Sequence, residues 1–275
     1  MDHPTTAVPE FIHDGDFLCV LKAHGYETVP RLAAAAAQFA GAMHPGAIAT
    51  EGTTVLALKY KDGVLVAGDR RATAGNLVMY DRAEKLIDID SSSIVAIAGV
   101  PAVAFEMARV LEHSFKYYQR SQLQEMSTAG KVRSLSKLLK ENLPLTLQGV
   151  GMVVPIFATY ERADGTEEGG KVYFYDALGA QFEGVDYAAS GSGSLAVRSV
   201  LHYLNTWGEK PLAKYNESEA VVTALRLLNT AADTDTATSG YNPKSNIVPI
   251  VRTITRDGIH EIGETELARV YRSEA

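Results

Sequence analysis

The sequence predicts an α+β protein in which two antiparallel sheets are stacked and helices cover both outer faces, a four-layer αββα sandwich. Three observations support this fold class: strands and helices come in groups, strand pairs close around short Asp-Gly turns, and the first two strands are apolar at nearly every position. Grouped elements argue against alternating β-α-β units and a parallel sheet. Strands that are apolar throughout indicate sheets covered on both faces.

The first strand pair is expected at residues 53–60 and 64–69, joined by a turn at Asp62-Gly63. An Asp-Gly turn between two apolar runs is a strong signal for a hairpin. Pairing about this turn returns the chain to its start, so we expect Asp69 to lie within reach of Thr53.

A second strand pair and a long helix follow. Residues 85–90 and 93–99 are rich in β-branched side chains, and the second run ends in glycine. Pro101 favours the start of a helix that continues to residue 120, because proline fits the first helical turn. The expected buried stripe of this helix consists of Phe105, Val110, Leu111 and Phe115.

The remaining elements are expected in the same grouped order. They are a helix from Ser127 or Thr128 to Asn142 that Pro144 closes, strands over 149–160 and 171–175, helices over 194–206 and 218–232, and strands over 246–254 and 258–262. Proline after a helix and turn residues between strands support these boundaries. No repeat or linker divides residues 53–275, so we expect them to form one domain.

Composition narrows the class of protein. The chain has 275 residues, of which 46% are hydrophobic, and a net charge of -7, so it lacks the cationic field that nucleic acid or anionic lipid requires. No apolar run reaches the roughly 18 residues that a membrane span needs. The single cysteine, Cys19, permits no disulfide within the chain, which favours a cytoplasmic protein.

Residues 1–52 differ from the rest of the chain. They hold six acidic and two basic side chains and an alanine-rich stretch, and no cationic start precedes an apolar run, as a secretory signal would require. Alanine favours helix but offers little area for a core. We therefore interpret residues 1–52 as a propeptide that is removed on maturation, and residues 53–275 as the folded domain.

Gly52-Thr53 is the predicted cleavage site. A cut after Gly52 would give Thr53 a free α-amine beside its hydroxyl, and that amine can serve as the base. Its reference pKa is about 8, and a nearby ammonium such as Lys85 would lower it by disfavouring the charged form. Asp69 would pair with Lys85 and compensate its buried charge. Gly99 would present its backbone N–H to an oxyanion.

Other chemistries have weaker support. The histidines after Thr53 are far apart and show no metal-ligand spacing, so neither a metal nor a cofactor is expected. No Gly-x-Ser-x-Gly elbow supports a Ser-His-Asp triad. Residues 191–196 match the loose Gly-x-Gly-x-x-Ala pattern of nucleotide-binding proteins, although the strand before them belongs to an antiparallel meander. Nucleotide binding therefore remains an alternative function to the threonine chemistry described above.

Several motifs together resemble a known family. They are Gly52-Thr53-Thr54-Val55, Gly68-Asp69-Arg70-Arg71, Lys85, Ala98-Gly99, Ser190-Gly191-Ser192-Gly193-Ser194 and Asp235-Thr236-Ala237-Thr238. In combination they resemble the catalytic β subunit of the 20S proteasome, of the actinobacterial type, in the N-terminal nucleophile (Ntn) hydrolase superfamily. The resemblance covers essentially all of residues 53–275 and implies the Ntn-hydrolase fold, a threonine endopeptidase activity and no cofactor.

The resemblance also implies a role for individual residues. The implied catalytic residues are the nucleophile Thr53, its charge partners Asp69 and Lys85, Gly99 in the oxyanion hole, and Ser192, Asp235 and Thr238 around the terminal amine and a bound water. The chain departs from the commoner Asp-x-x-Ser-Gly pattern, because threonine stands at 238 and Ser239 stands where glycine is expected.

Substrate binding follows from the same resemblance. Thr73 is implied to offer backbone hydrogen bonds to an extended peptide. The residues implied to line the primary specificity pocket are uncharged: Ala72, Ala83, Ile87, Ile97, Pro101 and Phe105. An apolar pocket rewards an apolar side chain, so cleavage after hydrophobic residues is expected. The Thr53 hydroxyl is also expected to attack the Gly52 carbonyl and so remove the propeptide, leaving the precursor inactive until then.

The implied partners are other subunits. The resemblance implies two homo-heptameric β rings between two α rings (α7β7β7α7) and a ring-shaped ATPase that feeds unfolded or tagged polypeptides through the α rings. A non-catalytic ring subunit is an alternative, because related α-type subunits lack an exposed threonine; Gly52-Thr53 with Asp69 and Lys85 argues against it. A bacterial two-ring protease of the heat-shock type also begins Thr-Thr but is shorter, and the Asp235 region fits the proteasome better.

Overall fold

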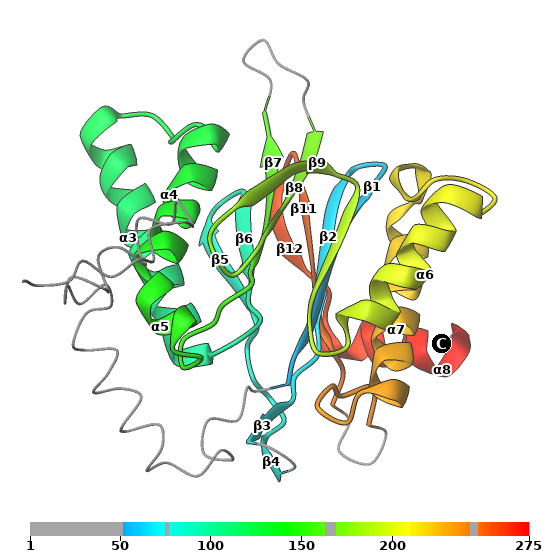
Figure 1. Cartoon of the computed structure of the whole chain (residues 1–275). Helices are drawn as coiled ribbons and strands as arrows, with labels where there is room; N and C mark the ends of the chain where they lie inside the picture. The colour runs from blue at the N-terminus through cyan, green and yellow to red at the C-terminus, as the bar shows by residue number, and fades with distance from the viewer. Residues whose placement is uncertain (1–51, 75–76, 163–168, 243–246, 275) are drawn as a thin grey trace, which may run out of the picture. The chain divides into compact units, whose positions relative to one another are not determined.

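The computed structural model describes residues 52–74, 77–162, 169–242 and 247–274. Within them, two five-stranded antiparallel sheets are stacked, and helices cover the outer face of each sheet (Figure 1). The predicted αββα sandwich is confirmed. The predicted propeptide, apart from Gly52, lies outside the described residues.

The first sheet has the order β10-β1-β2-β11-β12. Its strands are β1 (Thr54–Tyr60), β2 (Gly63–Gly68), β10 (Tyr187–Gly191), β11 (Ile250–Thr255) and β12 (Gly258–Glu261). The expected β1–β2 hairpin pairs Tyr60 with Gly63 and Val55 with Gly68. Asp69 therefore follows β2 beside the start of β1.

The second sheet has the order β5-β6-β7-β8-β9, and a separate two-stranded sheet joins β3 to β4. These strands are β3 (Ala72–Ala74), β4 (Leu77–Tyr80), β5 (Leu86–Asp90), β6 (Ser93–Ala96), β7 (Ile156–Glu161), β8 (Gly169–Tyr175) and β9 (Gln181–Val185). Lys85 directly precedes β5 and extends its pairing, because its carbonyl oxygen accepts the Ile97 N–H over 2.9 Å.

The helices form two groups, one on each side of the stacked sheets (Figure 1). They are α3 (Pro101–Gln122), α4 (Thr128–Glu141) and α5 (Leu143–Leu147) on one side, and α6 (Ser194–Trp207), η1 (Leu212–Lys214), α7 (Glu217–Thr234) and α8 (Glu264–Glu274) on the other. Ser127 caps α4 by accepting the Gly130 N–H, and Asn216 with Glu219 forms a capping box at α7.

Three apolar clusters occupy the three interfaces between the layers. In β1, Val55 and Ala57 pack between the sheets, whereas Leu56 and Leu58 pack under the helices α6 and α7. Successive side chains of a strand point to opposite faces, and both faces of β1 are covered. This explains why the strand is apolar at nearly every position.

Several expected boundaries were wrong. The strand expected from residue 149 begins at Ile156, because residues before it follow an irregular path on which Val153 bridges Gly99. Pro144 does not end the preceding helix but stands in the first turn of α5. In α3, Phe105 and Val110 are 41% and 37% exposed, because its buried face runs through Ala104, Met107, Ala108, Leu111 and Phe115.

Candidate active site

Thr53 is buried at the start of β1, and hydrogen bonds fix its backbone. The Ser192 N–H donates to the Thr53 carbonyl oxygen over 2.8 Å, and the Thr53 N–H donates to Ser192 Oγ over 3.3 Å. The Gly52 N–H donates to Thr73 Oγ1 over 3.1 Å. The residues on both sides of the Gly52–Thr53 peptide bond are therefore held in place.

A buried ion pair lies next to the start of β1. Lys85 Nζ donates to Asp69 Oδ1 over 2.6 Å, and Asp69 is fully buried. The Thr54 N–H donates to the same oxygen over 2.8 Å, and Lys85 also donates to the Arg71 carbonyl oxygen over 2.5 Å. A buried ammonium is costly unless it is paired, so Asp69 stabilises Lys85 at this position.

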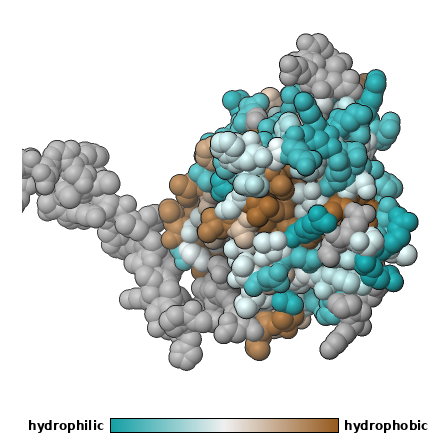
Figure 2. Space-filling model, turned by 90° about the vertical axis from the view of Figure 1, so that its right-hand side faces the viewer, coloured by the Kyte–Doolittle hydropathy of each residue, from teal (hydrophilic) through white to brown (hydrophobic). Residues whose placement is uncertain are grey.

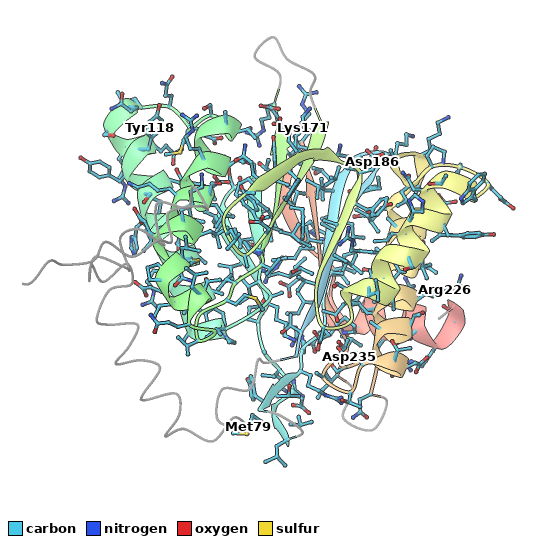
Figure 3. All side chains as sticks on the ribbon, viewed as in Figure 1. Met79, Tyr118, Lys171, Asp186, Arg226 and Asp235 are labelled. Carbon is cyan, nitrogen blue, oxygen red and sulfur yellow. The ribbon has the colours of Figure 1, made fainter. Side chains whose placement is uncertain are left out.

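The loop after α7 brings Asp235 and Thr238 to the same place. Asp235 Oδ2 accepts hydrogen bonds from Ser192 Oγ over 2.5 Å and from Thr238 Oγ1 over 2.6 Å. Thr238 Oγ1 also lies 2.6 Å from Thr54 Oγ1, which accepts the Gly193 N–H over 3.1 Å. Figure 3 shows Asp235 on the side of the sandwich toward the β3–β4 hairpin, where Met79 is labelled.

The surroundings of Asp235 shift its pKa downward. Partial burial raises the pKa of this carboxyl, but hydrogen bonds from Ser192, Thr238 and the Ala237 N–H, with the field of Lys85, outweigh that effect. A carboxylate that accepts several hydrogen bonds is favoured in its charged form. Asp235 is therefore an anionic acceptor for the two hydroxyl groups that flank Thr53 and Thr54.

Ser239 is a site residue to which the sequence assigned no role. Its N–H donates to Asp69 Oδ2 over 3.1 Å, its hydroxyl lies 3.4 Å from the same oxygen, and the Arg70 N–H donates to Ser239 Oγ over 3.3 Å. Thus Ser239 ties the loop after α7 to the end of β2. The only sign of this role in the sequence was that Ser239 stands where the family pattern has glycine.

Gly191 and Gly193 explain the glycine-rich loop without a nucleotide. A Cβ on Gly191, whose φ is +97°, would lie 1.8 Å from the Thr53 carbonyl oxygen, and a Cβ on Gly193 would lie 2.4 Å from Thr54 Oγ1. The strand before them, β10, pairs antiparallel with β1 rather than opening a β-α-β unit. These glycines permit close approach to Thr53, so the nucleotide-binding interpretation loses its structural basis.

A small apolar pocket opens beside Thr53. It has a volume of about 230 Å³ and is lined by Thr53, Ala72, Tyr80, Ala83, Glu84, Lys85, Ile97, Gly99, Pro101 and Phe105. Phe105, which is exposed on α3, faces this pocket rather than the core. Tyr80 and Glu84 were not expected here, and burial raises the pKa of the Glu84 carboxyl although Arg252 opposes that shift.

Three other expected residues have distinct positions. Ile87 does not line the pocket; it packs against the apolar cluster under α3. Gly99 adopts φ +114°, and a Cβ there would lie 2.1 Å from the Met152 carbonyl oxygen, so only glycine fits. Thr73, in β3, contacts Gly52 through its hydroxyl. The backbone hydrogen bonds to an extended peptide that the resemblance implies for Thr73 stay a prediction.

The described ranges lack two further features. No cluster of three or more His, Cys, Asp or Glu side chains able to hold a metal ion occurs in the part of the chain that the structure describes. Among those same residues, no helix is long and apolar enough to cross a membrane.

Stacked antiparallel sheets between two helical layers, with a threonine at the start of the first strand, are the architecture of the Ntn-hydrolase class. Comparison with known proteins gives the family within that class: the Proteasome subunit family matches residues 49–242. The chain belongs to this family.

Curated relatives agree with this assignment. Proteasome subunit beta 2 of Thermomonospora curvata is 37% identical over 230 residues, which cover 84% of this chain and 79% of that protein. Proteasome subunit beta of Jonesia denitrificans is 38% identical over 224 residues, covering 82% and 71%. Proteasome subunit beta 1 of Streptomyces avermitilis is 37% identical over 215 residues, covering 78% and 73%. The resemblance to the β subunit of the 20S proteasome is confirmed, and assembly with other proteasome subunits follows from the family.

Proposed function

We propose that this chain is a threonine endopeptidase subunit of the proteasome core particle, matured by its own cleavage between Gly52 and Thr53. The observation that carries the proposal is that Ser192 contacts the buried Thr53, the Asp69–Lys85 ion pair contacts the adjacent Thr54, and Thr53 and Lys85 line the same apolar pocket. These residues lie far apart in the sequence, and a role in folding alone would not require a threonine at their meeting point.

The first reaction is the removal of residues 1–52. The Thr53 hydroxyl loses its proton and its oxygen attacks the Gly52 carbonyl carbon; the C–N bond breaks, the nitrogen takes up a proton, and an ester joins Gly52 to Thr53. Water then hydrolyses this ester, releasing the Gly52 carboxylate and the hydroxyl. Because the nitrogen of Thr53 is an amide before this step, the precursor has no α-amine to act as a base.

The second reaction is the cleavage of other polypeptides. The α-amine of Thr53 accepts the hydroxyl proton, and the ammonium of Lys85 favours its neutral form. Ser192, with Asp235 and Thr238 behind it, orients the amine. The Gly99 N–H stabilises the oxyanion that forms on the substrate carbonyl.

The pocket supports a preference for cleavage after hydrophobic residues. Ala72, Ala83, Ile97 and Pro101 supply its apolar surface, and burial of an apolar side chain there is favourable. Thr73, which holds Gly52 in the precursor, would then contact the substrate. The assembled form is proposed to be α7β7β7α7, with a ring-shaped ATPase acting through the α rings.

The decisive measurement is the intact mass of the chain after coexpression with its α-type partner. A product that begins at Thr53 is expected for the wild type, together with hydrolysis of peptides after apolar residues. Thr53→Ala should leave the chain whole and inactive, whereas Thr53→Ser should still mature, because it keeps the hydroxyl. An uncut wild-type chain, or peptide hydrolysis by Thr53→Ala, would overturn the proposal in favour of a non-catalytic ring subunit.

A further inference from the structure

Gly52 packs against the loop that follows α7, and the contact leaves no room for a side chain. A Cβ on Gly52 would lie 1.7 Å from the Ala237 Cβ, 2.9 Å from the Ala237 Cα and 3.1 Å from its carbonyl oxygen. Real Cβ atoms do not approach other atoms within 3.0 Å. One methyl group, that of Ala237, therefore provides the worst contact by more than 1 Å.

The loop that carries Ala237 is held on both sides. Arg71 Nη1 donates to the Thr236 carbonyl oxygen over 2.9 Å and to the Thr238 carbonyl oxygen over 3.3 Å. The Ala237 N–H donates to Asp235 Oδ1 over 3.1 Å. A loop fixed by three hydrogen bonds cannot retreat from residue 52 without breaking several of them.

Ala237 is also separate from the apolar pocket, whose lining residues do not include it. A side chain at position 52 would thus point toward Ala237 and away from the pocket. The residue before the cleaved bond would consequently meet different surroundings in the two reactions. In self-cleavage it would meet Ala237, and in the cleavage of other chains it would meet the apolar pocket.

We propose that Ala237 is a specificity-determining residue for self-cleavage: its methyl group restricts position 52 to glycine. This inference rests on the proposed function. A larger residue at 52 would displace the peptide bond from the Thr53 hydroxyl, and misplacement by about 1 Å can slow a reaction roughly 100-fold.

The test follows the rate at which the full-length chain, coexpressed with the α-type partner, yields the product beginning at Thr53. Gly52→Ala should slow this rate about 100-fold relative to the wild type. Adding Ala237→Gly should speed the Gly52→Ala chain about tenfold, a partial rescue because the 2.9 Å contact with Cα stays. The Ala237→Gly single variant supplies the reference rate for the double variant.

Two matched controls distinguish the steric effect of the Ala237 methyl group from a general loosening of the loop. Thr236→Gly loosens the same loop but keeps the Ala237 methyl group, and Ala237→Ser keeps a Cβ; neither should rescue Gly52→Ala. Rescue by either control, or cleavage of Gly52→Ala at the wild-type rate, overturns the inference while the proposed function stands. If the wild-type chain itself stays whole, both fail. Should Ala237→Gly prevent folding, cleavage of Gly52→Ala at the wild-type rate would still overturn the inference.

Discussion

At the scale of single residues, Asp69 connects four segments of the site. Its two carboxylate oxygens accept hydrogen bonds from the backbone N–H groups of Thr54, Arg71 and Ser239 and from the Lys85 ammonium. These residues come from β1, the turn after β2, the loop after α7 and the start of β5. The charge of one buried carboxylate thus holds four parts of the site together.

Asp69→Asn keeps the shape but removes the charge. We expect a loss of about 3–5 kcal/mol in the free energy of unfolding, because the buried Lys85 ammonium loses its carboxylate partner at 2.6 Å. Self-cleavage and peptide hydrolysis should also stop. Guanidinium unfolding and intact mass measure the two effects.

Asp90→Asn is the matched control, because it removes the 2.7 Å partner of another buried lysine, Lys131. This variant should lose stability yet still mature. If Asp69→Asn matures at the wild-type rate, Asp69 has no part in the chemistry.

Asp235 gives a pH-dependent prediction. Its folded pKa lies below its ordinary value, so its ionisation stabilises the fold above the unfolded pKa of about 3.9, and this contribution is lost as the pH falls through the folded pKa. The difference in free energy of unfolding between wild type and Asp235→Asn should be constant from about pH 8 to 5 and shrink below about pH 4. Urea unfolding across this range tests it; a difference that grows toward low pH would contradict it.

The position of a site residue in the β1–β2 hairpin could be predicted from the sequence. The contacts of the residues in the loop after α7 could be predicted only in part. Asp69 follows from one local turn, because strand pairing fixes where residue 69 must lie. Ala237 reaches Gly52 and Ser239 reaches Asp69 only through the packing of α7 against the sheet. Nothing in the local sequence specifies that packing, which explains why their contacts were missed.

At the scale of elements, Arg252 fastens the two sheets to each other. It belongs to β11 of the first sheet, and its Nη1 donates to the Leu86 carbonyl oxygen over 2.6 Å and to Asp88 Oδ1 over 3.2 Å, both in β5 of the second sheet. Glu261 and Glu84 also pair with it. Burial raises the pKa of Glu84 and Asp88, and the guanidinium opposes that shift.

Arg252→Ala should lower the free energy of unfolding by about 2–4 kcal/mol at pH 7, because partly buried carboxylates lose their cation. Without Arg252 the carboxyl pKa values rise further, so the loss is present above them and diminishes as the pH falls through them. Unfolding measured at pH 7 and near pH 4 should show the smaller difference at the lower pH. Lys171→Ala, which breaks only a partly exposed pair with Glu161 at 4.0 Å, should cost less than about 1 kcal/mol at either pH.

The sequence predicted the strands that are buried on both faces, but it did not predict the short exposed strands. β1 and β2 are apolar runs bounded by a turn, and their positions were predicted to within about one residue. β3, β4 and β9 were missed. β4 is exposed along its whole length, so burial imposes no alternation of apolar and polar residues on it.

At the scale of the whole molecule, the β3–β4 hairpin carries the most exposed apolar side chains close to the site. Leu77, Val78, Met79 and Tyr80 are 69%, 54%, 67% and 57% exposed. Figure 2 shows hydrophobic atoms at the lower edge, the level at which this hairpin lies in Figure 1. Contiguous exposed apolar surface is typical of an interaction site, and the family assembles from several subunits.

Leu77→Glu with Met79→Glu should therefore reduce the share of the chain found in high-mass complexes after coexpression with the α-type partner. Both side chains are solvent-exposed in the single chain, so its thermal unfolding should change little. Native mass spectrometry measures assembly. Leu178→Glu, a change at a comparably exposed turn after β8, is the control. Unchanged assembly of the double variant would remove the hairpin from the interface.

The site residues lie far apart in the sequence, so the ribosome synthesises them at different times. Thr53, Asp69 and Lys85 are synthesised early, but Ser192, Asp235 and Ser239 come much later, and β11 must still pair with β2 before β12 can pair with β11. Synthesis proceeds from the N-terminus, and long-range strand pairing is slow. A ribosome-bound chain thus holds Thr53, the proposed nucleophile, without the groups that are proposed to activate it. If Thr53 cleaves its own chain as proposed, the order of translation protects the nascent polypeptide from premature cleavage.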